Sequence, residues 1–291
     1  MCIMTSKKRG FNLPTEAPYL LQYKRQLIYK IRQSVMAWLN INDTFNPDAL
    51  DNSVLGIGAD LTSHDSGFHY HHKGQLLFSQ HGCMRITLEN SVSILPPTRV
   101  AWIPGHCIHR VEMRHTVGYR SIYFDQTVIT KLPTQLMILS TTPLLTAILE
   151  RIALSPFSTD WQCGAPANLL SVCIDELTSA KEETMTLPLP ADYRLSPLLE
   201  MNVLPSLKEA ATRCGASEKT ITRLFRKETG MSYQQWRQQW RVIKAIELLA
   251  AGRKQGDIAH QLHFASDSAF ITFFKAMLGE SPRTYMKMNH H

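Results

Sequence analysis

The sequence lacks any apolar run that approaches the length of a membrane span, and its first ten residues, MCIMTSKKRG, contain no signal-peptide core. Nor does it contain a CxxC pair or a regular spacing among its six cysteines, Cys2, Cys83, Cys107, Cys163, Cys173 and Cys214. This pattern suits a reducing compartment, where we expect each cysteine to be a small buried apolar side chain rather than a ligand. We therefore expect a cytoplasmic chain with no membrane partner.

A clear excess of basic over acidic residues is lacking in most of the chain and is confined to its last third. Residues 192–291 contain 15 Lys and Arg against 9 Asp and Glu, whereas residues 1–191 contain 16 against 15. Nearly all of the net charge of +7 therefore lies in the last third, where basic side chains can displace counterions from phosphates. A charge cluster alone is equally consistent with a solvated face that binds no partner. Sequence motifs are needed to distinguish the two.

Residues 206–230, SLKEAATRCGASEKTITRLFRKETG, have the pattern of a helix-turn-helix unit. Ser206 and Glu209 form a capping box, and Gly215 ends the first helix. Ser217 then caps a second helix, whose buried stripe we expect to be Ile221, Leu224 and Phe225. A short helix, a tight turn and a basic second helix suit a motif that places its second helix in the major groove.

The same plan returns near the end of the chain. Residues 254–279 carry a cap at Ser266 and an expected buried stripe of Phe270, Phe273 and Phe274. Between the units, residues 232–250 contain no proline or glycine and should form one helix of roughly 28 Å. Successive major-groove openings lie about 34 Å apart, so both units could contact one duplex. Because the repeat runs head to tail, the half-sites should be unequal and directly oriented.

Over residues 192–288 these features resemble the AraC/XylS family of transcriptional regulators. The resemblance rests on LFRKETGMS, WRVIKAIELL, DIA, the FxxxFK of Phe270, Phe274 and Lys275, and GESPRTYMK. It implies double-stranded DNA as a partner, with RNA polymerase as a further candidate partner. The sequence departs from the family at His263, where glycine is usual, and at Thr272, where many members carry a polar or basic DNA-contacting residue.

Several side chains are candidates for DNA contact. On the first recognition helix we assign Lys219, Thr222 and Arg223 to base edges, because arginine suits a bidentate contact with guanine. Arg226 and Lys227 are assigned to phosphates, and Thr220 is a further candidate for DNA contact. The second recognition helix has fewer strong donors; its candidates are Asp267, Ser268, Ala269, Thr272 and Lys275.

The N-terminal part has a different character. Between residues 53 and 124 it contains seven short β-rich runs separated by Gly, Asn, His or Pro turns: VLGIGADL, QLLFSQ, MRITLE, SVSILP, RVAWIP, HRVEMR and YRSIYF. Many short strands indicate a barrel or sandwich. Eight of the twelve histidines also lie here, between His64 and His115.

The spacing HxHx3Qx6G of His69, His71, Gln75 and Gly82, followed by Pro104 and His109, is similar to the two cupin motifs. Imidazoles at i and i+2 share one strand face, which in a cupin is the barrel interior. His69, His71 and His109 could hold a divalent metal there, with Gln75 in the position usually taken by glutamate. We favour a metal-free effector pocket of the same four residues, because an amide in place of a carboxylate weakens a metal site.

Two other functions remain open. A cupin enzyme fused to a DNA-binding domain would need a metal that activates a substrate, but the acidic ligand is missing, so we expect no enzyme activity. Alternatively, the chain could be a regulator that senses no ligand, which would occupy its operators regardless of any compound.

The expected fold is multidomain α+β: a cupin-like β-barrel or sandwich with flanking helices, then an all-α domain with two helix-turn-helix units. We place a partly helical extension at 1–50, with an amphipathic stretch from Leu20 to Leu39, the effector domain at 51–182, a linker at 183–193 and the DNA-binding domain at 194–291. Two helices close the effector domain, one from Thr142 to Leu154 and one after Pro166. The second helix has an apolar stripe of Leu169, Leu170, Cys173 and Leu177, a pattern that is usually part of a core. The resemblance nevertheless assigns a dimer contact to this helix, so we expect a homodimer.

Overall fold

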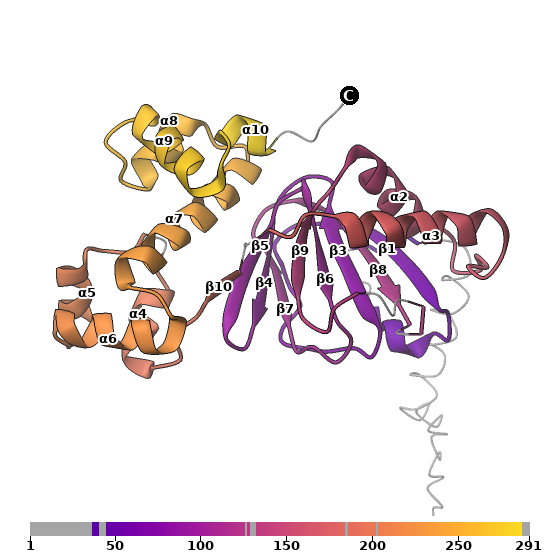
Figure 1. The fold of residues 1–291 in the computed structure, drawn as a ribbon, viewed down its shortest axis with the longest axis horizontal. Helices are drawn as coiled ribbons and strands as arrows, with labels where there is room; N and C mark the ends of the chain where they lie inside the picture. Colours follow the sequence, from indigo (N-terminus) through magenta and orange to yellow (C-terminus); the bar gives the residue numbers. More distant parts are fainter. Residues whose placement is uncertain are drawn as a thin grey trace, which may run out of the picture.

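The computed structural model describes residues 37–40, 45–125, 127–128, 132–183, 186–201 and 203–286. A β domain and a helical domain lie side by side, and the long helix α7 (Tyr233–Ala250) connects two lobes of the helical domain (Figure 1). Most of the stretch from Leu20 to Leu39, and with it most of the expected N-terminal extension, lies outside the described residues. Within the described part, none of the helices combines the length and apolar character needed to span a membrane.

The β domain consists of two antiparallel five-stranded sheets, which confirms the predicted cupin-like architecture. The first sheet has the order β1 (Val54–Leu61), β8 (Val117–Phe124), β3 (Gly74–Ser79), β6 (Arg99–Ile103) and β9 (Met137–Ser140). The second has the order β10 (Thr186–Pro188), β5 (Ser91–Leu95), β4 (Met84–Leu88), β7 (Arg110–Met113) and β2 (His64–Asp65). All seven predicted runs are strands, whereas β2, β9 and β10 were not predicted.

Two helices, α2 (Pro143–Ala153) and α3 (Gly164–Ser179), cover the first sheet. Thr142 caps α2 as expected, and α3 begins at Gly164, two residues before the predicted Pro166. The end of α2 lies so close to β1 that a Cβ at Gly56 would stand 2.4 Å from the Ile152 carbonyl oxygen. Glycine is therefore required in this strand by the approach of the helix.

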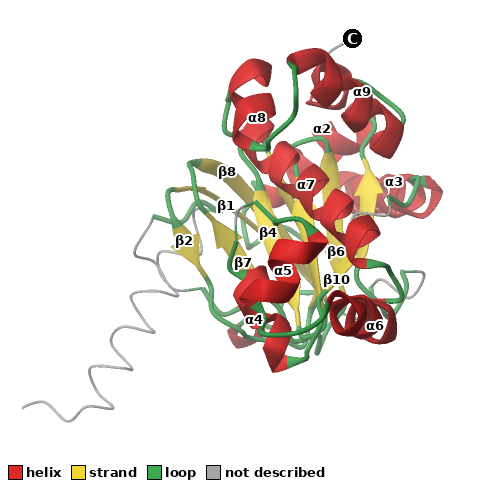
Figure 2. Cartoon of the chain, turned by 90° about the vertical axis from the view of Figure 1, so that its left-hand side faces the viewer, coloured by secondary structure: helices red, strands yellow, loops and turns green. Residues whose placement is uncertain are grey.

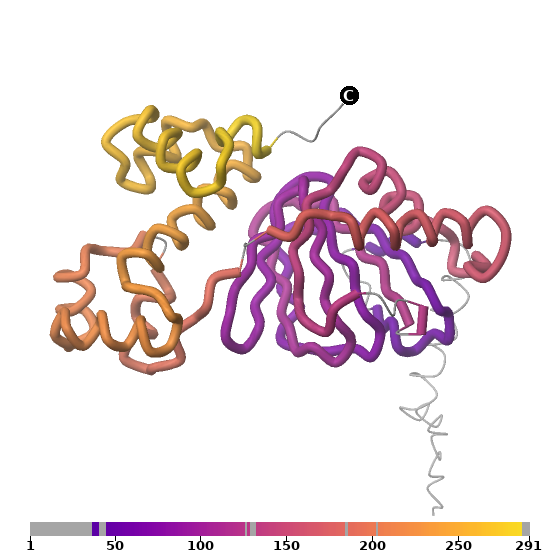
Figure 3. Tube along the Cα trace, in the orientation of Figure 1, coloured from indigo at the N-terminus to yellow at the C-terminus, as the bar shows by residue number. Residues whose placement is uncertain are grey.

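Part of the expected linker, residues 183–193, is ordered as β10, which pairs with β5. Beyond it come the short 3₁₀ helix η2 (Tyr193–Leu195) and α4 (Ser196–Leu199); another 3₁₀ helix, η1 (Pro47–Ala49), precedes β1. The chain passes from the β domain to the helical domain after β10 (Figure 3). The Trp236 indole of α7 donates a hydrogen bond of 2.6 Å to the carbonyl of Pro188. The linker is therefore bound to the helical domain by this bond and to the β domain by the pairing of β10 with β5.

The helical domain contains both predicted units and the continuous helix between them. The first unit consists of α5 (Leu207–Arg213) and α6 (Glu218–Thr229), and the second of α8 (Gln255–Gln261) and α9 (Asp267–Leu278), followed by α10 (Pro282–Met286). Helix α7 lies in front of the second sheet in Figure 2 and contacts β5 and β10. Trp236 and Trp240 of α7 stack with ring centroids 5.3 Å apart and are buried.

Candidate DNA interface and effector pocket

The first unit is built as its sequence predicts. Ser206 and Glu209 form both hydrogen bonds of the capping box, and Gly215 adopts φ 60 in the turn. The Ser217 hydroxyl accepts a 3.1 Å hydrogen bond from the Thr220 amide at the start of α6. The turn between α5 and α6 is therefore fixed by a cap on each helix and by a residue that tolerates a left-handed conformation.

Helix α6 buries its apolar stripe and presents basic side chains to solvent. Ile221, Leu224 and Phe225 are buried, as predicted. Lys219, Arg223, Arg226 and Lys227 are exposed, and Thr222 is half-buried beside them. Thr220 differs from the rest, because its hydroxyl lies 2.9 Å from that of Ser217 and is engaged at the helix start. We therefore regard Thr220 as the least available of the predicted DNA contacts.

The second unit has the same backbone arrangement, but its recognition helix exposes fewer strong hydrogen-bond donors. Ser266 caps α9, and Asp267, Ser268, Thr272 and Lys275 are exposed. Lys275 is the one basic residue in α9, and Ala269 contributes only a half-buried methyl group. The predicted donor shortage of the second recognition helix is therefore visible on its exposed face.

One packing prediction for α9 was only partly correct. Phe270 and Phe274 are buried, but Phe273 is only half-buried. Its ring packs 5.0 Å from that of Phe264, which precedes α9, and near the guanidinium of Arg241 on α7. Helical spacing placed Phe273 on the core side, where it does pack, but it stays half-buried beside Phe264 and Arg241.

The spacing of the two units is set by α7. Its 18 residues correspond to a length of about 27 Å at 1.5 Å per residue. This is of the same order as the roughly 34 Å between successive major-groove openings on one DNA face. Contact of both units with one duplex stays a prediction.

A cavity of about 400 Å³ lies in the β domain. Its polar lining residues are His69, Gln75, Asn40, His64, Asp65 and Ser66. The apolar and aromatic lining residues are Leu39, Phe45, Ile57, Ala59, Leu61, Val111, Met113, Tyr119 and Tyr123. A cavity of this size that combines apolar walls with placed polar groups is typical of a small-molecule site.

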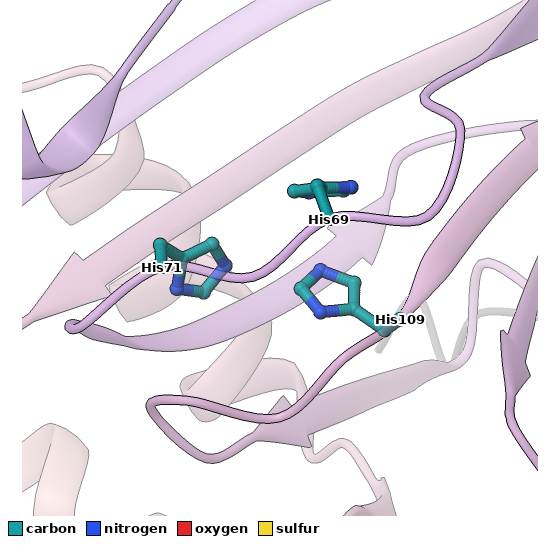
Figure 4. Close-up of side chains that lie close together, drawn as sticks. All are labelled: His69, His71 and His109. Carbon is teal, nitrogen blue, oxygen red and sulfur yellow. The ribbon is translucent and has the colours of Figure 1, made fainter.

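Three histidines converge beside this cavity. His69, His71 and His109 each offer a ring nitrogen, and these atoms all lie within 4.8 Å of one another (Figure 4). The backbones of His69 and His109 form an antiparallel bridge with two hydrogen bonds of 2.9 Å. The predicted effector residues are thus brought together, because the segment before β3 pairs with the segment before β7.

Each of the three imidazoles has its Nδ1 atom next to a backbone carbonyl. The partners are Gly67 for His69 at 3.0 Å, Cys107 for His109 at 2.8 Å, and Lys73 for His71. An Nδ1 that donates to a carbonyl leaves the Nε2 lone pair free, which is the usual arrangement of a metal-binding histidine.

Burial keeps two of these rings neutral. It lowers the pKa of His109 to about 4 and also lowers the pKa of His71. The Nε2 atom of His109 is buried and has no hydrogen-bond partner among the described residues. The His71 Nε2 atom is hydrogen-bonded to Gln75 Oε1 at 3.2 Å, with roles that depend on the imidazole tautomer. The ring nitrogens of three converging imidazoles and a neighbouring amide oxygen are ligand types that a divalent metal ion accepts.

A hydroxyl network holds Gln75, and the sequence did not reveal it. Its Nε2 atom donates to Ser121 Oγ at 2.8 Å, and the hydroxyls of Tyr123 and Tyr119 lie at 3.2 and 3.4 Å. These three residues alternate along β8, which places them on one face, and β3 pairs with β8 so that Gln75 lies opposite Tyr123. The alternation in the run YRSIYF is the signal that could have identified them.

A charged contact joins the two domains. Arg85 of β4 donates through Nε to Glu247 of α7 at 3.1 Å, its Nη2 contacts the same oxygen, and Lys244 lies 3.1 Å from the other oxygen. Burial raises the pKa of Glu247, but Arg85 and Lys244 together outweigh this effect and leave it below the ordinary value. The sheet that contains β7 is thereby linked to the helix between the two DNA-binding units.

Fold and sites together define a transcription regulator with a ligand-binding β domain and two DNA-binding helix-turn-helix units. An AraC-like ligand binding domain matches residues 52–157, and a helix-turn-helix domain matches residues 210–288. The HTH-type transcriptional regulator NimR of Escherichia coli (strain K12) is 31% identical over 261 residues, which cover 87% of this chain and 94% of NimR. The chain belongs to the AraC family of transcriptional regulators.

Other similarities cover less of the chain or are more distant. The regulator RipA of Corynebacterium glutamicum is 34% identical over 119 residues, which cover 40% of this chain and 36% of RipA. A structure of ToxT from Vibrio cholerae with a bound unsaturated fatty acid has a TM-score of 0.33 and 14% identity, and covers 81% of this chain and 96% of ToxT.

Proposed function

We propose that a small molecule enters the cavity of the β domain and thereby changes how α6 and α9 occupy promoter DNA. The observation that carries this proposal is the cavity of about 400 Å³, two of whose polar lining residues, His69 and Gln75, lie in the cluster with His71 and His109. The effector that fits is a small molecule with an apolar part and polar groups, one of them directed at the imidazoles. Such a regulator would act in the cytoplasm, where its DNA lies.

The route from the cavity to the DNA-binding units is short. His109 directly precedes β7, whose Val111 and Met113 line the cavity. Strand β7 pairs with β4, and Arg85 of β4 binds Glu247 on α7. A ligand that displaces β7 would change the position of Arg85, and a second cavity of about 180 Å³ beside this contact leaves space for that movement. Differential binding to the two arrangements would then couple effector and DNA.

On the DNA side, the exposed faces support the assignment of Lys219, Thr222 and Arg223 to base edges. Arg226 and Lys227 are suited to phosphates, because they lie near the end of the same helix. In the second unit, Ser268, Ala269 and Thr272 would contact bases weakly, and Lys275 would contact a phosphate. Asp267 lies at the start of α9 and would limit approach to a phosphate by repulsion.

A divalent metal bound by His69, His71 and His109, with Gln75 Oε1 as a fourth ligand, is a second candidate property of the pocket. The observation that favours it over the metal-free interpretation is the buried His109 Nε2 atom without a partner among the described residues. The metal would offer an open coordination position to a polar group of the effector. Elemental analysis of protein purified without chelator should give close to one metal per chain, and His109→Ala should remove it. A metal-free wild type that still responds to its effector would establish the metal-free pocket.

We also propose a homodimer that forms through the outer surface of α2 and α3, since the apolar stripe of α3 belongs to the core. Leu170, Cys173 and Leu177 are buried inside the β domain against its own core. Val172 of α3 and Leu144 of α2 are instead 43% and 53% exposed, so the outer surface of these helices is the candidate contact. Sedimentation equilibrium of wild type and Val172→Glu tests it, since a dimer built there should dissociate. We also propose that the DNA-bound chain contacts RNA polymerase at a promoter.

The test of the effector pocket compares two histidines. Footprinting of the purified chain on the DNA upstream of its own gene, with and without candidate compounds, should show protection that changes with the effector. His71→Ala should bind DNA normally without effector and lose the response, whereas His81→Ala, an exposed histidine outside the cluster, should respond normally. A normal response in His71→Ala would rule out the pocket.

The same experiment separates the alternatives. Protection that no compound changes would favour a regulator that senses no ligand. Turnover of a compound that depends on bound metal would favour a cupin enzyme fused to a DNA-binding domain. We propose regulation without catalysis, because the matched relatives are transcriptional regulators and the histidine cluster lacks an acidic member.

A further inference from the structure

One face of α7 holds both DNA-binding units through their backbones. Tyr233, Arg237 and Arg241 follow one another at intervals of four residues and therefore lie along one ridge of the helix. The Tyr233 hydroxyl donates to the Pro205 carbonyl at 2.9 Å, and Arg237 Nε donates to the Leu204 carbonyl at 2.8 Å. These two contacts fix the segment that leads into the first unit.

Arg241, one turn further along, reaches the second unit instead. Its Nη2 atom donates to the Leu262 carbonyl at 2.8 Å and lies 3.4 Å from the His263 carbonyl oxygen. Its guanidinium also stacks on Phe264, 3.8 Å from the ring centroid, and lies 5.4 Å from that of Phe273 in α9. Arg241 therefore contacts both the turn between α8 and α9 and the second recognition helix itself.

The turn that Arg241 holds is strained. His263 adopts φ 57, a left-handed conformation that disfavours a side chain with a Cβ. In the first unit Gly215 adopts φ 60 at the corresponding position without that penalty. A strained turn persists only where its surroundings hold it, and the two carbonyl groups that Arg241 contacts belong to His263 and to the residue before it.

We propose that Arg241 is a positioning residue, which compensates for the missing glycine and fixes the orientation of α9 relative to α6. The inference rests on the proposed use of both recognition helices on one duplex. Arg241 and Arg237 together make α7 the element that sets the spacing of the two half-sites. Arg241 contacts no DNA in this role; it determines whether the second helix meets the groove when the first is bound.

The test measures spacing selectivity. Duplexes selected by the full-length wild-type chain from a random library are compared with derivatives that carry about 5 extra base pairs, half a turn of DNA, between the half-sites. Wild type should prefer the selected spacing, and Arg241→Ala should lose this preference by about tenfold, the order expected for lost charge-assisted hydrogen bonds. Arg241→Ala with His263→Gly should recover it, because glycine holds the left-handed turn unaided.

Two further variants make the outcome decisive. Arg253→Ala removes an exposed arginine just after α7 and should weaken binding to both spacings by the same factor. Arg241→Lys keeps the charge but not the planar fork, so it should lose part of the selectivity even if Arg241→Ala fails to fold by circular dichroism. Full selectivity in Arg241→Ala or Arg241→Lys, or no recovery with His263→Gly, would overturn the inference. A wild type that selects no sequence would instead overturn the proposed DNA recognition.

Discussion

The two helix-turn-helix units have the same backbone plan but different means of forming it. The first has a capping box at Ser206, glycine in its turn and an exposed face with four basic residues. The second begins at Lys254 without a side-chain cap, has His263 in a left-handed turn, and depends on Arg241 of α7 for support. Helix α7 contacts both units, but in the first unit it binds the segment before α5, whereas in the second it binds the turn between the two helices itself.

This difference indicates a division of tasks. A unit with a stable turn and arginine on its readable face can discriminate base pairs. A unit with serine, alanine and threonine on its readable face mainly contacts phosphates and methyl groups, and it fixes the position of the protein on the duplex. We therefore expect the first unit to supply most of the sequence information and the second to add affinity at a fixed distance.

The largest effect should come from the readable face of the first unit. Arg223→Ala should weaken binding to a selected duplex by about 1–3 kcal/mol and relax specificity at one base pair, because a bidentate contact with guanine is lost. Binding measurements on duplexes with every single base change would check this. Equal weakening on all duplexes would show that Arg223 contacts only phosphate.

Next in size is the cost of a side chain in the first turn. Gly215→Ala should lower the free energy of unfolding by about 1–2 kcal/mol, the penalty for a Cβ in the left-handed region. A Cβ at this position meets nothing within 4 Å, so the backbone alone accounts for the cost. Denaturant unfolding should show it, with Gly215→Asn less affected because asparagine tolerates this conformation. If both variants are as stable as wild type, the turn is not constrained as described.

The converse change in the second turn should have the opposite sign. His263→Gly should raise the free energy of unfolding by about 0.5–1 kcal/mol, since relief of the strain exceeds the added flexibility of the unfolded chain. Thermal unfolding followed by circular dichroism would measure it. A destabilised variant would mean that the imidazole makes a contact worth more than the strain.

The smallest effect should come from the face of α9. Thr272→Ala should weaken DNA binding by less than about 1 kcal/mol and act mainly at a thymine, because only a hydroxyl and a methyl contact are changed. The duplex panel used for Arg223 provides the comparison. A loss as large as that of Arg223→Ala would remove the distinction between the two units.

Sequence periodicity predicted the elements well, because their stabilising pattern is local. The two helix-turn-helix units, the continuous helix from Ser232 to Ala250 and all seven β-rich runs follow from caps, turns and burial spacing. The three-residue strand β10 was missed, since its pairing with β5 depends on a contact between distant segments. The degree of burial of Phe273 was overestimated for a similar reason, because its contacts with Phe264 and Arg241 depend on the fold of the turn and of α7.

The site was only partly predictable. The convergence of His69, His71 and His109 followed from the resemblance to cupin motifs, and the geometry brings them together. The hydroxyl network around Gln75 needed the register of β3 against β8, and the Arg85–Glu247 contact joins residues 162 positions apart. Long-range contacts of this kind leave no periodic signal in one sequence.

Selection of duplexes from a random library by the full-length chain tests the central claim most directly. The account predicts two directly oriented half-sites about one helical turn apart, with most of the base preference in the half-site contacted by α6. A footprint on the selected duplex with the Arg223→Ala variant would assign that half-site. A palindromic site, or equal base preference in both half-sites, would contradict the account.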